Sequence, residues 1–105
     1  MTERDFKIAR ELKRRLEESV GLVDFRVFGS RVRGDEDEYS DMDVFIEVES
    51  INKVLKELIL DTVWEVGFKN FIVISPLIFT RDEIERSALR SSPIVRNIVA
   101  EGVSL

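Results

Sequence analysis

The chain has 105 residues, of which 44% are hydrophobic and 35% are charged, and its net charge is −5 at pH 7. Histidine and cysteine are both absent, which excludes disulfides, Cys/His zinc sites, thiol nucleophiles and Ser-His-Asp catalysis. This length predicts one domain over residues 1–105, and the acidic charge argues against a broad basic face that grips duplex nucleic acid.

A helix and two strands are predicted in the first half of the chain. Apolar residues recur at steps of three and four over residues 3–19, where Thr2 is a candidate N-cap and Gly21 is the expected end. Residues 23–28 then alternate apolar and polar side chains, which is the pattern of a half-buried strand. Residues 42–48 alternate in the same way and predict a second strand.

The middle of the chain predicts a further helix and a strand. Ser50 is a candidate N-cap for a helix over residues 51–66, and Gly67 stands where a helix end favours a left-handed residue. A strand-like run over residues 71–79 contains Pro76. Because proline cannot donate to a strand ladder, this run is expected at a sheet edge or at a strand end.

Two more helices are predicted at the C-terminus. Thr80 and Glu83 have the spacing of a capping box that opens a helix toward Arg90. Pro93 suits the first position of a last helix, which Gly102 ends. The order of elements predicts an α+β fold, in which helices pack on one face of a small mixed β-sheet.

A glycine–serine turn follows the first strand. Behind a strand, Gly29 and Ser30 let backbone N–H groups converge on an anion with no side chain in the way. Arg31 and Arg33 can also reach phosphates, although Arg33 can instead pair with the acidic loop over residues 34–39. By itself the glycine–serine pair fits an ordinary turn better than a phosphate site.

Asp41 and Asp43 supply two carboxylates after this turn. On an extended strand they point to the same face with Cα atoms roughly 6.6 Å apart. Their carboxylates can then hold one Mg²⁺ ion or bridge two ions about 3.5–4 Å apart. An isolated pair of this kind fits an exposed acidic strand edge, but the turn upstream favours phosphate and metal binding.

Residues 28–34 (FGSRVRG) followed by residues 40–44 (SDMDV) resemble the signature of the DNA polymerase β-like nucleotidyltransferase superfamily, and the short chain resembles its minimal members. The resemblance implies a nucleotidyltransferase fold like the polymerase β palm. It also implies Mg²⁺-dependent transfer of a nucleotidyl group from a nucleoside triphosphate, with ATP expected, to a protein or small acceptor. The implied phosphate ligands are Gly29 and Ser30, and the implied catalytic metal ligands are Asp41 and Asp43.

Active members of this superfamily carry a third acid on the next strand of the sheet. The matching register in this chain places Ile72 there, and neither Asn70 nor Ser75 replaces a carboxylate well. Two functions therefore stay open: a nucleotidyltransferase, or a weakened or inactive nucleotide-binding module that acts as an antitoxin-like partner. A third alternative is an unrelated α+β domain that carries the motif by chance.

The resemblance also implies a protein partner. Minimal members are often encoded beside a small helical, toxin-like protein with which they form a complex, so such a partner is expected here. A homodimer is a further option, through the edge near Pro76 or the C-terminal helix. No apolar run approaches the roughly 20 residues of a membrane-spanning helix, and no signal peptide is recognisable, so we expect a cytoplasmic protein with no membrane partner.

Overall fold

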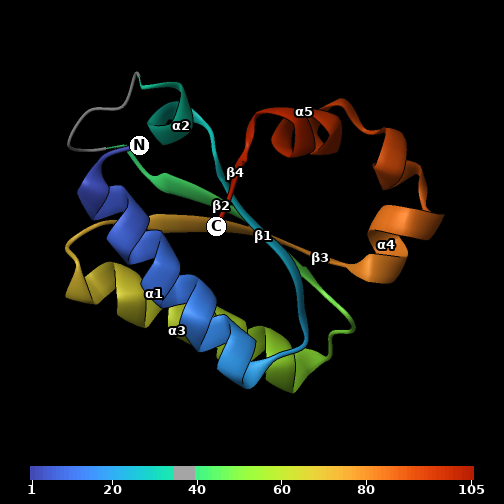
Figure 1. Cartoon of the computed structure of the whole chain (residues 1–105). Helices are drawn as coiled ribbons and strands as arrows, with labels where there is room; N and C mark the ends of the chain where they lie inside the picture. Colours follow the sequence, from blue (N-terminus) through green and yellow to red (C-terminus); the bar gives the residue numbers. More distant parts are fainter. Residues whose placement is uncertain (35–39) are drawn as a thin grey trace.

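The computed structural model describes residues 1–34 and 40–105. Residues 35–39 of the expected acidic loop lie outside the described residues. One mixed sheet has the strand order β3-β2-β1-β4, and helices lie against it (Figure 1). The α+β class and the small mixed sheet are as predicted. In chain order the elements are α1 (Glu3–Ser19), β1 (Leu22–Phe28), α2 (Ser30–Arg33), β2 (Met42–Val48), α3 (Lys53–Lys69), β3 (Ile74–Thr80), α4 (Arg81–Arg86), the 3₁₀ helix η1 (Ala88–Ser91), α5 (Pro93–Glu101) and β4 (Val103–Ser104).

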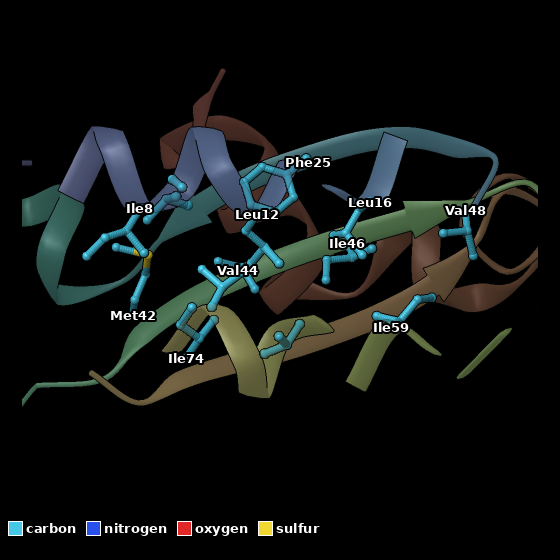
Figure 2. Close-up of a cluster of buried hydrophobic side chains, with 14 residues drawn as sticks. Ile8, Leu12, Leu16, Phe25, Met42, Val44, Ile46, Val48, Ile59 and Ile74 are labelled. Carbon is cyan, nitrogen blue, oxygen red and sulfur yellow. The ribbon is translucent and has the colours of Figure 1, made fainter. Parts of the chain in front are cut away.

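The two long helices, α1 and α3, lie on one face of the sheet and bury the main hydrophobic core there (Figures 1 and 2). Successive strand residues point to opposite faces, so alternate side chains of β2 enter this core and Asp43 lies on the other face. The core residues labelled in Figure 2 are Ile8, Leu12, Leu16, Phe25, Met42, Val44, Ile46, Val48, Ile59 and Ile74.

The short helix α5 lies over the opposite face, against β1 (Figure 1). Val95 and Ile98 are the buried side chains of this helix, and the guanidinium of Arg26 on β1 donates to the carbonyl of Val99 at 3.2 Å. Phe45, which points to the same face of the sheet as Arg26, is also buried. The sequence predicted helices on one face, and the structure adds α5 on the other, because the chain returns beyond α5 as β4 beside β1.

The sheet combines both kinds of strand pairing. β1 pairs with β2 antiparallel, and β2 pairs with β3 parallel through the crossover made by α3. β3 is an edge strand that contains Pro76, as predicted. β4 was not predicted, because its two residues, paired antiparallel with β1, are too few to show a periodic pattern.

Helix starts were predicted better than helix ends. Thr2 and Asp5 form a capping box at α1, and Thr80 and Glu83 form a second one at α4, both as expected. α1 also ends at Ser19 as expected, whereas α4 stops at Arg86, well short of the predicted end. The chain then turns through η1, because the Ser87 hydroxyl caps that new turn by accepting the N–H of Leu89 at 3.1 Å.

Both ends of α3 differ from the prediction, the C-terminal end most. The helix starts after Asn52, whose side chain caps it, instead of after Ser50, and it continues past Gly67. The left-handed residue is Phe71, with φ of 58°. A Cβ atom on Gly67 would lie 2.8 Å from the carbonyl oxygen of Ile72, so this glycine allows the chain that leaves α3 to pass close to the helix.

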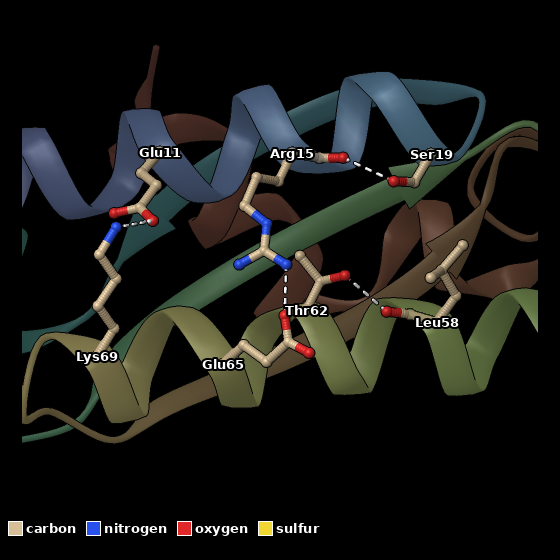
Figure 3. Close-up of polar contacts among 7 residues, drawn as sticks. All are labelled: Glu11, Arg15, Ser19, Leu58, Thr62, Glu65 and Lys69. Carbon is tan, nitrogen blue, oxygen red and sulfur yellow. Dashed lines mark hydrogen bonds and ion pairs between the residues drawn. The ribbon is translucent and has the colours of Figure 1, made fainter.

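Ion pairs join the middle of α1 to the C-terminal part of α3 (Figure 3). Arg15 on α1 pairs with Glu65 on α3, and the Nζ atom of Lys69 lies 3.1 Å from Oε2 of Glu11. These side chains are partly exposed, so each pair contributes at most about 1 kcal/mol and the buried apolar faces supply most of the attraction. Within the described part of the chain, no helix has both the length and the apolar character needed to cross a membrane.

We predict that Gly67→Ala destabilises the fold by about 1–3 kcal/mol, because the new methyl group overpacks against the Ile72 carbonyl. Gly21→Ala is the matched control, since its Cβ would meet only the flexible side chain of Glu49, at 3.3 Å. Urea unfolding of both variants measures the difference. Equal stability of the two variants would show that the backbone at Ile72 can shift to accommodate the methyl group at little cost.

Candidate functional site

The glycine–serine turn links the end of β1 to α2. Gly29 is the N-cap of α2 with φ 79° and ψ −153°, a conformation that is open essentially to glycine alone. The carbonyl of Gly29 accepts the N–H groups of Val32 and Arg33, each at 3.1 Å. The first amide groups of a helix have no acceptor within it, so the backbone at Ser30 is placed to bind an anion.

The carboxylate of Asp43 lies directly against this turn. Phe28 and Asp43 are paired across β1 and β2, and a Cβ atom on Gly29 would lie 2.5 Å from Oδ2 of Asp43. Any side chain at position 29 would therefore displace the carboxylate. The structure thus places the two halves of the sequence motif in contact. A motif that had arisen by chance would give no reason to expect this contact.

The two predicted acids differ in their surroundings. Asp41 is exposed and lies just before β2, whereas Asp43 is half-buried within the strand. Partial burial raises the pKa of Asp43, the negative charge of Asp41 raises it further, and the positive charge of Arg33 lowers it. Carboxylate and guanidinium charges thus gather around the end of the glycine–serine turn.

The oxygen donors at this place fit a hard divalent cation. Asp41 and Asp43 offer carboxylate oxygens, which Mg²⁺ prefers, and the missing side chain of Gly29 lets the carboxylate of Asp43 lie directly against the turn. A divalent cation would also offset the repulsion that raises the pKa of Asp43. Within residues 1–34 and 40–105, no group of three or more acidic side chains is placed to share one ion.

The prediction that Arg31 binds phosphate needs revision. Arg31 is 6% exposed; its Nη1 donates to Oδ1 of the buried Asp5 at 2.8 Å, and its Nη2 donates to the carbonyl of Ser40 at 2.6 Å. Oδ2 of Asp5 accepts the backbone N–H of Thr2 at 3.1 Å. Arg31 therefore ties the start of α1, the turn and the segment before Asp41 together, and Arg33 is the exposed arginine near Asp43.

The position expected for a third acid is not Ile72. Because α3 continues to Lys69, the chain reaches β3 only at Ile74, and Ile72 packs against the core with its N–H bonded to the carbonyl of Gly67 at 3.0 Å. The β3 residue paired with Asp43 is Ser75. No carboxylate therefore neighbours Asp43 on β3, as predicted, although the residue that stands there is a different one.

Glu47 does not complete the site either. It points to the same face as Asp43 but is paired with Asp24 on β1 and with Phe79 on β3, toward the other end of β2. Burial raises the pKa of Glu47, the nearby charge of Asp24 raises it further, and the positive charge of Arg81 lowers it. This acid belongs to a separate charged region.

A hollow of about 130 Å³ adjoins the turn and extends to α5. The backbone of Gly29 and the side chain of Arg33 line one side, and Ile94, Asn97 and Glu101 of α5 line the other. The sequence does not indicate that these α5 residues belong to the site, since no local motif marks them. They reach the turn only because α5 folds back over β1.

Known proteins share both the sequence pattern and the fold of this chain. The sequence model of the nucleotidyltransferase domain family matches residues 7–104, whereas no curated protein matches the chain. A candidate minimal nucleotidyltransferase has a similar structure, with a TM-score of 0.64 and 20% identity over 99% of this chain and 97% of that one.

Two other solved structures are also similar. A toxin–antitoxin crystal structure with AMP-PNP has a TM-score of 0.59 and 15% identity over 98% of this chain and 72% of that one. A candidate nucleotidyltransferase from Sulfolobus solfataricus has a TM-score of 0.51 and 20% identity over 93% of this chain and 76% of that one. At these identities the structures establish a common fold.

We predict that Arg31→Met destabilises the protein by about 3–5 kcal/mol, because it leaves the buried carboxylate of Asp5 without its counter-charge. Arg14→Met is the control: the Arg14–Glu18 pair on α1 is about two-thirds exposed, so its loss costs under about 0.5 kcal/mol. Urea unfolding measures both changes. Similar losses in the two variants would show that the buried pair has no special role in stability.

We also predict that Asp43→Asn stabilises the metal-free protein at neutral pH. The pKa of Asp43 is raised in the folded state, so the folded protein holds this proton more tightly than the unfolded chain. The contribution of Asp43 to stability therefore falls as pH rises from the ordinary aspartate pKa of about 3.9 through the raised value.

Thermal unfolding in EDTA at a series of pH values measures this effect. The melting temperature of Asp43→Asn should exceed that of the wild type at pH 7, and the difference should shrink as pH falls through this window. Asp61→Asn, at an exposed position on α3, is the control. A less stable Asp43→Asn variant at pH 7 would show that the carboxylate contributes favourable contacts instead.

Proposed function

The chain belongs to the nucleotidyltransferase domain family, and we propose that it binds a nucleoside triphosphate with Mg²⁺ and transfers a nucleotidyl group to an acceptor. The observation that carries this proposal is the contact between the backbone of Gly29 and the carboxylate of Asp43. It joins an anion-binding turn to a cation-binding acid at one end of the sheet. Either part alone would be compatible with many functions.

Each residue of the site has a defined role in this proposal. The backbone at Gly29 and the N–H group and hydroxyl of Ser30 hold the terminal phosphates, and the exposed Arg33 adds positive charge beside them. Asp41 and Asp43 would hold Mg²⁺, which when bound supplies neutralisation of the phosphate charge. The close packing of Asp43 on the turn keeps the phosphate and metal ligands in a fixed relation.

The proposed reaction is a displacement at the α-phosphorus. The acceptor oxygen forms a bond to the α-phosphorus, the bond between this atom and the bridging oxygen of the β-phosphate breaks, and pyrophosphate leaves. The acceptor proton passes to water, because the β3 residue beside Asp43 is Ser75 and not a carboxylate that could act as a base. The contribution of the chain is therefore mainly the positioning of the two reactants.

ATP and a protein partner complete the proposal. The similar toxin–antitoxin structure contains AMP-PNP, which supports an adenine nucleotide as the ligand of this chain. The same structure supports a toxin-like protein, expected to be small and helical, as its partner and as a candidate acceptor. The acceptor can equally be a small molecule that carries a hydroxyl group.

Ser75 favours a second candidate function. Without a third carboxylate beside Asp43 on β3, proton removal from an acceptor lacks a general base, a loss that typically costs 10²–10⁴-fold in rate. The turn and the two acids would still bind Mg²⁺ and a triphosphate. The chain would then act as a nucleotide-binding, antitoxin-like module with little or no transfer activity.

Calorimetric titration of ATP into the protein, with Mg²⁺ and then with EDTA, tests binding. Wild type should bind only with Mg²⁺, and Asp41→Asn/Asp43→Asn should lose at least tenfold in affinity, about 1.4 kcal/mol. Glu57→Gln/Asp61→Asn on the exposed side of α3 changes the net charge equally and should bind like wild type. Absence of Mg²⁺-dependent binding in wild type would refute both candidate functions.

Transfer from α-labelled ATP then distinguishes the two functions. The assay is run with and without the product of a neighbouring gene, and label on a protein or small acceptor indicates the transferase. Labelling should disappear in Asp43→Asn. Mg²⁺-dependent ATP binding without any label transfer would leave the binding module as the function.

A further inference from the structure

A second surface of the molecule, away from the glycine–serine turn, carries an exposed aromatic side chain in an unfavourable backbone conformation. Phe71 has φ of 58° and is 94% exposed. Within the described ranges it is the one residue other than glycine with positive φ. Bulky side chains rarely adopt this conformation, in which glycine or asparagine would be less strained. Phe71 thus contributes little to the folding of its own chain, and its position suggests contact with another molecule.

A hollow of about 220 Å³ lies beside Phe71, between α3 and the start of β3. Trp64, Phe68 and Val73 line it, together with Gly67. The rings of Trp64 and Phe68 stack 4.9 Å apart at 11°, which gives one wall a rigid aromatic surface. An apolar cavity of roughly 150 Å³ is enough to hold benzene, so this hollow can accept a phenyl ring.

The projecting ring and the hollow that fits it are on the same surface. Such a surface is self-complementary, because a two-fold axis can place each projection in the hollow of the other copy. We propose that two copies of this chain form a symmetric dimer in which Phe71 of each enters the hollow beside Trp64 of the other. This inference is independent of the proposed function, since it uses none of the phosphate or metal ligands.

The size of the apolar surface agrees with a dimer. Its exposed members are Leu60, Trp64, Phe68, Phe71 and Val73, and they are 42–94% exposed. Aromatic side chains carry about 150–250 Å² each, so the surface offers roughly 600 Å² per copy and roughly 1,200 Å² in a dimer. Specific interfaces begin at about 1,000 Å² in total, and roughly 600 Å² is at the upper end of the apolar patches that monomers expose.

The charges around this surface do not oppose association. Lys53 and Lys56 on the outer side of α3 are positive, and Glu57 and Asp61 are negative. The rim of the surface therefore carries both signs. Two copies can approach there without the repulsion that a single sign would cause, despite the net charge of −5 on each chain.

Sedimentation velocity over a range of micromolar concentrations tests the dimer. Wild type should shift from monomer to dimer as its concentration rises, and Phe71→Asn should remain monomeric over the same range. Asparagine tolerates positive φ, so this variant should fold at least as stably as wild type, which thermal unfolding verifies. Val73→Lys should also prevent dimerisation by blocking the hollow. Val99→Asn removes an exposed apolar side chain from α5 and should dimerise like wild type.

Trp64, the single tryptophan of the chain, gives a second readout. Its emission should move to shorter wavelength as the concentration of wild type rises, because the partner ring excludes water from it, and should not move in Phe71→Asn. A wild-type protein that stays monomeric throughout would overturn the proposal. A dimer that Phe71→Asn and Val73→Lys leave intact would overturn it as well.

Discussion

The buried ion pair between Asp5 and Arg31 holds in place the segments that form the candidate site. Asp5 caps α1 by accepting the N–H of Thr2, and Arg31 lies one residue beyond Ser30. The same guanidinium reaches the carbonyl of Ser40, immediately before Asp41. A buried pair of this kind is costly to break, so one side chain joins the proposed phosphate-binding and metal-binding halves of the site to the start of α1.

The sheet gives the site its second constraint. One face is covered by α1 and α3 and supplies the main core, so every alternate residue of β2 must be apolar. The residues between them lie on the other face, where Asp43 meets the glycine–serine turn and its pKa is raised by burial and by Asp41. Acidic groups kept close together against their electrostatic preference are typical of functional sites.

Signals that depend on a few neighbouring residues predicted much of this fold. The capping boxes at Thr2 and Thr80 and the alternation along β1 and β2 are local, and the structure has them where the sequence indicates. The errors lie at helix ends, where a competing cap such as Ser87 or a close backbone approach changes the boundary. Gly67 has the sequence context of a helix end, yet it is needed inside α3 because the chain at Ile72 passes over it.

The candidate site shows the same division between local pattern and tertiary contact. The spacing of Gly29, Ser30, Asp41 and Asp43 in the chain identified the motif, because a turn after a strand and two acids at alternate positions have few other uses together. The sequence could not reveal that Arg31 is buried against Asp5, since these residues are 26 positions apart.

The amino-acid sequence by itself determined the local elements, the polarity of each strand face and the identity of the phosphate and metal candidates. These follow from periodicity, caps and turn chemistry, which act over a few residues. Only the tertiary structure decided that α5 covers the second face, that Ser75 neighbours Asp43, and that Phe71 projects beside an apolar hollow. These features depend on how the helices and strands pack, and packing energies depend on the shapes of whole surfaces that no short segment encodes.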